Sequence, residues 1–141
     1  MDSFDRLVDI IARLRSPDGC PWDREQTHAS IKSNLLEESY EALEAIDKGE
    51  MAKLCEELGD ILMQIVLHAQ IAAEQDKFDI SNVLQGINAK LIHRHPHVFG
   101  KTKAKDAQEV VLSWEALKQE EREETSLLSS LPKGMPALAH S

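Results

Sequence analysis

Cysteine is scarce in this sequence. The two cysteines, Cys20 and Cys55, lie far apart without the paired spacing of a zinc motif, so they indicate a reducing compartment and no structural zinc. No apolar run approaches the length of a membrane span, and residues 1–16 are rich in Asp and Arg where a signal peptide would be apolar. We therefore expect a cytoplasmic protein with no membrane partner.

Positive charge is also in short supply. The 141 residues include 16 Lys and Arg against 25 Asp and Glu, which gives a formal net charge of −9. Such a balance argues against nucleic acid or an anionic membrane as a broad-surface partner. A phosphate-bearing ligand remains possible if divalent cations neutralise it locally. The length suits one domain, and a domain of this size often strengthens its core by pairing with a second copy.

The alternating pattern of β-strands is absent. Apolar residues recur instead at steps of three and four, as they do in amphipathic helices. This period predicts five helices, at about 4–15, from between 30 and 34 to 47, 50–74, 81–95 and 106–122. Short connections predict an all-α, antiparallel bundle of four to five helices. The domain is predicted to cover residues 1–124, with an irregular tail at 125–141.

The apolar stripes of these helices are the candidate core. Each stripe follows the helical period. The first, second and fourth stripes consist of Phe4, Leu7, Val8, Ile11 and Leu14; of Leu36, Tyr40, Leu43 and Ile46; and of Val83, Leu84, Ile87 and Leu91. The fourth is predicted to face inward. The third helix is apolar on a face wide enough for burial on two sides.

Carboxylates interrupt the second and third helices in a regular pattern. Glu37, Glu38 and Glu41 form E-E-x-x-E, and Glu57 with Asp60 forms E-x-x-D. Residues three or four apart on a helix have Cβ atoms roughly 5–6 Å apart, so each helix carries a carboxylate pincer. A short turn makes the two helices antiparallel, which brings the pincers to one level. Converging carboxylates without cysteine or histidine favour Mg²⁺, or Mn²⁺, as the ion they hold.

A purely structural explanation competes with this metal site. Acids in the first turn of a helix capped at Asn34 would complement the helix dipole, which would account for Glu37 and Glu38. It does not account for the other three acids, which lie well inside their helices. A solvated acidic face remains the alternative to the metal site.

Several motifs, in order, resemble one family. The carboxylate motifs, Gly19–Asp23 (G-C-P-W-D), Arg94–Phe99 (R-H-P-H-V-F) and Trp114-Glu115 are similar to those of the MazG branch of the all-α nucleoside triphosphate pyrophosphohydrolases. The likeness extends from about Arg6 to Arg122. It implies Mg²⁺-dependent hydrolysis of (deoxy)nucleoside triphosphates between the α and β phosphorus atoms, giving monophosphate and pyrophosphate.

The resemblance also implies residue roles. The metal ligands would be Glu38, Glu41, Glu57 and Asp60, while Glu37, with Glu38, would serve catalysis by orienting or activating water, or by reaching a further metal. Phosphate contacts would come from Lys53, Lys90 and Arg94, and contacts to the base or sugar from Trp22 and Trp114. Family members assemble as homodimers or higher homo-oligomers, so a tryptophan could come from a partner subunit.

Alternatives to these roles stay open. Lys90 and Arg94 could be surface cations, and Trp114 could be a core residue. Bracing of a helix end is a more common role than transition-metal binding for histidines placed like His93, His95 and His97. The family often carries the domain twice, and the tail resembles a linker to a second copy. A catalytically weak nucleotide-binding, metal-binding or dimerisation domain of a longer MazG protein is therefore the alternative function.

Overall fold

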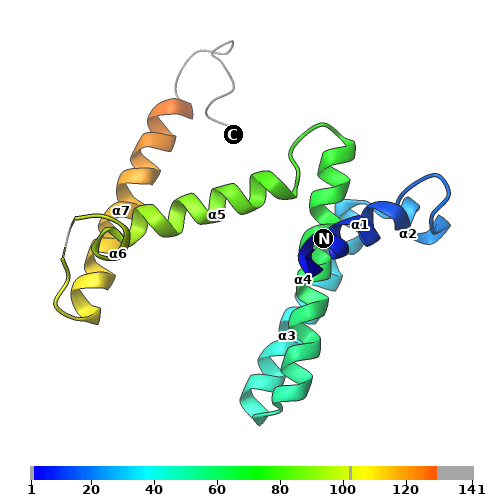
Figure 1. Ribbon diagram of the computed structural model, residues 1–141, viewed down its shortest axis with the longest axis horizontal. Coiled ribbons are helices and arrows are strands. Elements are labelled where there is room, and N and C mark those ends of the chain that lie inside the picture. Colours follow the sequence, from blue (N-terminus) through cyan, green and yellow to red (C-terminus); the bar gives the residue numbers. More distant parts are fainter. Residues whose placement is uncertain (1, 102, 130–141) are drawn as a thin grey trace. The chain divides into compact units, whose positions relative to one another are not determined.

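The regular secondary structure in the described part of the chain is all α-helical. The computed structural model describes residues 2–101 and 103–129, with side chains as far as Thr125. Within these residues no strand forms, and the helices are α1 Ser3–Leu14, α2 Pro21–Glu25, α3 His28–Lys48, α4 Met51–Glu74, α5 Ile80–Arg94, α6 Pro96–Phe99 and α7 Ala107–Ser129 (Figure 1). The predicted all-α class is confirmed. None of the described helices has the length and apolar character to cross a bilayer.

The helices fall into two compact units, Met1–Ile80 and Ser81–Ser141. The first unit contains α1 to α4, and the second contains α6, α7 and nearly all of α5. Two short helices, α2 and α6, occupy segments predicted as loops, and each begins at a proline, which suits the first turn of a helix. The last helix reaches Ser129, so residues 125–129 of the predicted tail are helical. The rest of that tail lies outside the described residues.

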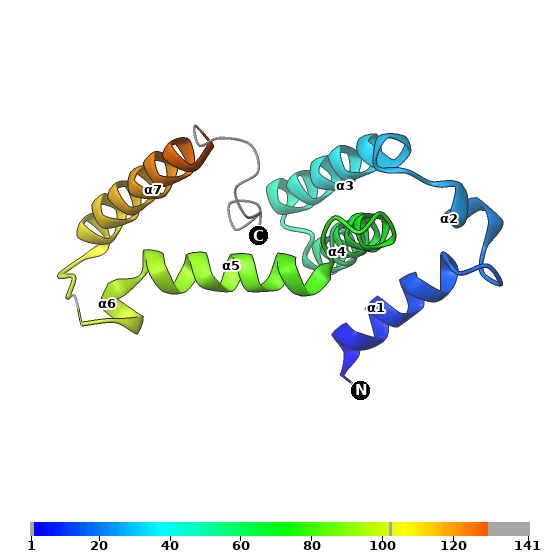
Figure 2. The ribbon, with the colours of Figure 1, turned by 90° about the horizontal axis from the view of Figure 1, so that it is seen from above.

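Helices α3 and α4 form an antiparallel hairpin, side by side in both views (Figures 1 and 2). Gly49 ends α3 in the left-handed conformation with φ 69°, which glycine adopts without steric cost. The start of α3 is earlier than predicted. Thr27 and Ser30 form a reciprocal capping box there, in which each side chain accepts a hydrogen bond from the other's backbone N–H.

The core of the first unit lies where α1 and the hairpin meet. Ile11, Ile31, Val66, Leu67 and Ile71 are buried together, and the stripe predicted on the first helix packs against them with Phe4, Leu7, Val8 and Leu14. This part of the predicted core is confirmed.

The other two stripes are exposed in the single chain. On α3, Leu36, Tyr40, Leu43 and Ile46 are 54–64% exposed, and on α5 the four predicted inward residues are 37–47% exposed. That the α5 stripe faces inward stays a prediction. On α3 the buried residues are Ile31, Ala42 and Ala45. Buried residues of α4 include Ala69 and Ala72. The alanines let the two helices approach closely, and Ile31 is the large apolar side chain that α3 buries.

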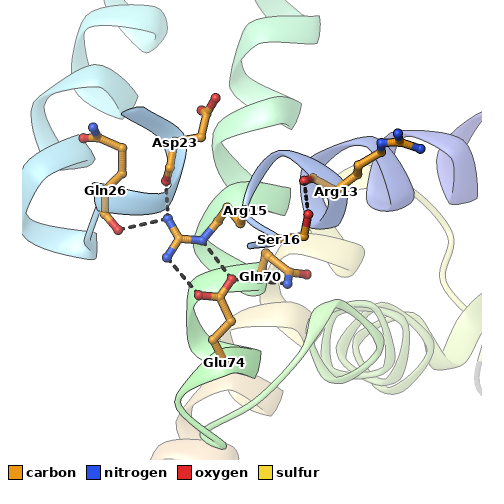
Figure 3. Close-up of polar contacts among 7 residues, drawn as sticks. All are labelled: Arg13, Arg15, Ser16, Asp23, Gln26, Gln70 and Glu74. Carbon is orange, nitrogen blue, oxygen red and sulfur yellow. Dashed lines mark hydrogen bonds and ion pairs between the residues drawn. The ribbon is translucent and has the colours of Figure 1, made fainter. Parts of the chain in front are cut away.

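Arg15 links α2 to the C-terminal end of α4 (Figure 3). Arg15 Nε and Nη2 donate to the Glu74 carboxylate at 2.8 and 2.9 Å. Its Nη1 donates to the backbone oxygens of Asp23 and Gln26. The Arg15 side chain is 7% exposed, so one guanidinium joins three segments that lie far apart in sequence.

A pair of histidines joins the start of α3 to α4. The Nδ1 atoms of His28 and His68 are 2.8 Å apart, so one ring donates its Nδ1–H to the other. Burial, and then the charge of His28, lower the pKa of His68. The lowered pKa favours the neutral form of His68.

Candidate metal centre

Three of the four predicted metal ligands come together between α3 and α4. One carboxylate oxygen from each of Glu38, Glu41 and Glu57 lies within 4.8 Å of the other two. Glu38 and Glu41 lie one helical turn apart near the middle of α3, and the antiparallel hairpin places Glu57 of α4 opposite them. With α3 starting at His28, Glu37 and Glu38 are well beyond its first turn, so capping does not explain them.

The three carboxylates are buried to different extents. Glu57 is only 5% exposed, while Glu38 and Glu41 are half-buried. Oε2 of Glu38 and Oε2 of Glu57 are both buried without a hydrogen-bond partner among the described residues. A buried carboxylate oxygen without a partner is costly, because it has lost its hydrogen bonds to water and gained none in the protein. These oxygens therefore require a proton or a cation.

The pKa values of Glu57 and Glu41 in the cluster are both raised. The Glu38 side chain, within hydrogen-bonding reach, raises the pKa of Glu57, and burial raises it further. The pKa of Glu41 is raised by hydrogen bonding to Glu57 and by the charge of Glu57. Carboxylates that share a site resist being ionised together unless a cation is present.

Three predicted residues surround the cluster. Asp60 is outside the three-oxygen group, but its charge contributes to the raised pKa of Glu57. Exposed Glu37 acts on the pKa of Glu41 in the same direction. Lys53, also exposed, is the neighbouring cation, and its charge opposes the rise in the pKa of Glu41.

The donor set fits a hard divalent cation. All candidate ligands are carboxylate oxygens, which Mg²⁺ and Mn²⁺ prefer, and the described part of the chain brings no cysteine or histidine into the group. Oxygens on opposite sides of an octahedral Mg²⁺ are about 4.2 Å apart, since each bond is about 2.1 Å. The cluster is therefore close to the size that Mg²⁺ needs. Glu38 and Glu57 would give it their unpaired oxygens.

Trp22 does not join the cluster within one chain. It lies on α2, which Arg15 ties to Glu74. A rise of about 1.5 Å per residue places Glu74 roughly 25 Å along α4 from Glu57. The indole is 60% exposed. Trp22 could meet a nucleotide at this cluster only if that cluster belonged to another copy of the chain.

The other predicted binding residues belong to the second unit. Lys90 is exposed on α5. Arg94 forms an ion pair with Glu121 of α7, and its guanidinium lies over the Trp114 ring, 5.6 Å from the centroid. Two of the predicted residues, Arg94 and Trp114, are thus in direct contact with each other.

The histidines around Pro96 brace the end of α5, as favoured from the sequence. His95 donates from Nδ1 to the backbone oxygen of Leu91 at 2.7 Å, and its ring meets the face of Trp114 edge-on. Among residues 2–101 and 103–125, Glu38, Glu41 and Glu57 are the single group with metal-binding spacing, so the histidines form no such group.

Sequence reasoning missed several partners. Nothing in the local pattern pairs His28 with His68, Arg15 with Glu74 or Arg94 with Glu121, because each pair lies 27 or more residues apart. The charge pattern did hold a signal for a cationic segment, because residues 81–105 contain five Lys and Arg and no Asp or Glu.

A helical hairpin that brings three carboxylates together defines an all-α protein with a candidate site for a divalent cation. Residues 26–99 match the family model of the MazG nucleotide pyrophosphohydrolase domain. The chain belongs to this MazG family.

Known relatives extend the match beyond the family segment. The chain is 46% identical over 142 residues to a nucleoside triphosphate pyrophosphohydrolase of Escherichia coli K12, covering 98% of this chain and 54% of that protein. It is 48% identical over 138 residues to the uncharacterized protein YabN of Bacillus subtilis, covering 96% of this chain and 28% of that protein. The chain therefore spans about half or less of these relatives.

A solved structure is also similar. The crystal structure of a MazG-related protein from Thermotoga maritima superposes with a TM-score of 0.68 at 31% identity. The match covers 82% of this chain and 98% of that one, which supports the helical fold over most of the described residues.

Proposed function

We propose that this chain hydrolyses (deoxy)nucleoside triphosphates at the α–β phosphoanhydride bond, giving nucleoside monophosphate and pyrophosphate, with Mg²⁺ as cofactor and Mn²⁺ as a substitute. The observation that carries the proposal is the pair of buried, unpartnered oxygens of Glu38 and Glu57 within a three-carboxylate cluster. The pyrophosphohydrolase relatives from Escherichia coli and Thermotoga maritima, both 46% identical, support the same activity.

The carboxylates would hold the metal and the attacking water. Glu38, Glu41, Glu57 and Asp60 are the proposed ligands, and bound Mg²⁺ supplies charge neutralisation and a template for phosphate oxygens. Phosphoryl transfer depends mainly on positioning and charge. Glu37, exposed beside Glu41, would orient a water or accept its proton.

Cations of the chain would bind the remaining phosphate charge. Lys53 lies beside the carboxylate cluster. Lys90 and Arg94 lie on one face of α5, within the acid-free stretch 81–105. A metal–triphosphate complex requires both kinds of group, because the metal requires carboxylates while the phosphates require cations.

A homo-oligomer, at least a dimer, is the proposed assembly, and the cytoplasm the proposed compartment. The exposed apolar residues of α3 and α4, among them Tyr40, Leu43 and Leu58, are what a second copy would cover. In such an assembly Trp22 could reach the base or sugar at a neighbour's cluster, and Trp114 could serve the same role.

The test is product identification with a panel of NTPs and dNTPs. With Mg²⁺, wild type should release pyrophosphate and monophosphate in equal amounts, and chelation of the metal should stop the reaction. Glu57→Gln should lower kcat at least about 100-fold, because it removes a buried ligand of the metal. Glu56→Gln, its exposed neighbour, is the control and should keep wild-type kcat. Release of orthophosphate and diphosphate would refute the proposed reaction.

A second candidate function follows from the length of the relatives. The chain covers 54% of one pyrophosphohydrolase and 52% of another, so the activity of the longer proteins need not reside in this portion. The alternative is a catalytically weak domain that binds nucleotide and metal, or that dimerises. Calorimetric binding of nucleotide with Mg²⁺, but without any turnover, would favour it.

A further inference from the structure

Arg94 is held by a single carboxylate in the second unit. Its Nε and Nη2 both donate to Oε2 of Glu121, the Nε bond being 3.1 Å long. The Arg94 side chain is 17% exposed and the Glu121 side chain 26% exposed. The third nitrogen, Nη1, has no partner among the described residues. One edge of the guanidinium is thus occupied and another is open.

An aromatic ring fixes the plane of the same guanidinium. Arg94 lies over Trp114, 5.6 Å from the ring centroid, and arginine stacks favourably in this position. His95 meets Trp114 edge-on, with ring centroids 4.8 Å apart, and is itself anchored to the Leu91 backbone. Carboxylate and ring together remove the rotational freedom that a long arginine side chain otherwise has.

Glu121 of α7 lies beside basic residues of α5. Arg94, hydrogen-bonded to it, lowers the pKa of Glu121, and the charges of His93 and Lys90 lower it further. His93 Nδ1 is 3.7 Å from Glu121 Oε1. A carboxylate here reduces the positive charge that a phosphate would meet, so its presence needs a reason other than attraction of phosphate.

We propose that Glu121 is a positioning residue, which holds the Arg94 guanidinium flat on Trp114 so that its open Nη1 edge is presented to a phosphate oxygen of the substrate. This inference rests on the proposed function, because it assumes that Arg94 binds phosphate. It adds to that function by assigning a role to Glu121, an acid that would not itself contact phosphate. Planar, fixed guanidinium groups bind phosphate with more geometric specificity than free ones.

The test compares binding with turnover in the full chain. The probe is the α,β-methylene analogue of a nucleoside triphosphate, titrated calorimetrically with Mg²⁺, while KM and kcat are measured with the hydrolysable triphosphate. Glu121→Ala should raise both Kd and KM about tenfold and leave kcat within about twofold, because a fixed charged contact is lost at a phosphate. Glu121→Gln should restore most of the affinity, since its amide oxygen accepts the same two hydrogen bonds. Glu120→Gln, an exposed neighbour on α7, is the matched control.

A double mutant separates positioning from simple bracing. If Glu121 acts through Arg94, adding Glu121→Ala to Arg94→Ala should change Kd no further. Additive losses would overturn the proposal, as would a Kd that falls in Glu121→Ala, which would make Glu121 a competitor of phosphate. Pyrophosphate release by wild type, with unchanged affinity in all Glu121 variants, would overturn it and leave the proposed function standing. Wild type that binds the analogue without turnover would refute only the activity, and wild type that binds no analogue would overturn both.

Discussion

Glu57 is the residue on which the candidate metal centre depends most. It is the most buried of the three clustered carboxylates and lies opposite the other two across the hairpin. Its raised pKa, caused by Glu38 and by burial, shows that the cluster is destabilised while it is ionised without a cation. The same residue should therefore govern both metal binding and stability.

Thermal unfolding with and without Mg²⁺ tests this at Glu57. A ligand of the native state stabilises by about 2.7 kcal/mol at a hundredfold excess over Kd, so wild type should gain several degrees in Tm. Glu57→Gln should lose this gain, yet without Mg²⁺ it should be at least as stable as wild type, because a repelling charge is removed. Equal Mg²⁺ gains in wild type and in Glu57→Gln would contradict the assignment.

His68 predicts a pH dependence of stability. Its pKa is lowered from 6.5 by burial, so the folded protein binds the proton more weakly than the unfolded chain. This contribution to stability is therefore present above pH 6.5 and is lost as the pH falls from there through the lowered pKa.

Chemical denaturation between pH 8 and pH 5 measures this effect. His68→Gln should show a smaller loss of unfolding free energy on the acid side than wild type. His97→Gln, a change in the second unit, should keep the wild-type slope. An unchanged slope in His68→Gln would show that His68 does not titrate as described.

At the scale of elements, Arg15 makes the most hydrogen bonds of the charged side chains that hold α2 in place among the described residues. The guanidinium makes four hydrogen bonds at once, two to a carboxylate and two to backbone oxygens, whereas the ammonium group of lysine has three N–H groups (Figure 3). Arg15→Lys should therefore lower the free energy of unfolding by about 1–3 kcal/mol. Arg24→Lys, on exposed α2, should cost much less, because Arg24 makes one exposed hydrogen bond. Urea denaturation of both variants checks the comparison, and equal losses would refute the special role of Arg15.

Helix positions could be predicted because periodicity and caps are local. Gly49 and the apolar steps of α1 gave correct boundaries, whereas the Thr27–Ser30 capping box lacks the usual Glu or Gln and its helix start was placed too late. The carboxylate cluster was also accessible from sequence, since its geometry follows from i to i+3 spacing and one short turn.

At the scale of the whole molecule, sequence pattern could not tell what covers an apolar face. The stripes on α3 and α5 follow the helical period as clearly as the stripe on α1, yet only the last is buried within the chain. Burial depends on which partner an element meets, and long-range partners such as His68 for His28 leave no local trace. The same limit applies to Glu121 and Arg94.

The exposed stripe of α3 predicts self-association. Tyr40 and Leu43 are 64% and 55% exposed, and a surface of this kind is costly in water unless a second copy covers it. Leu43→Glu should shift the mass measured by light scattering toward one protomer without loss of helix by circular dichroism. Ser3→Glu, in the first turn of α1, adds the same charge as a control and should leave the mass unchanged. A wild-type mass of one protomer at micromolar concentration would contradict the dimer.

Anomalous diffraction from crystals grown with MnCl₂ tests the central claim most directly. If the hairpin carboxylates hold a divalent cation, a manganese peak should lie among Glu38, Glu41 and Glu57, about 2.2 Å from their oxygens. The peak should disappear in Glu57→Gln crystals. A peak-free cluster in wild type, with manganese bound elsewhere or not at all, would contradict the account.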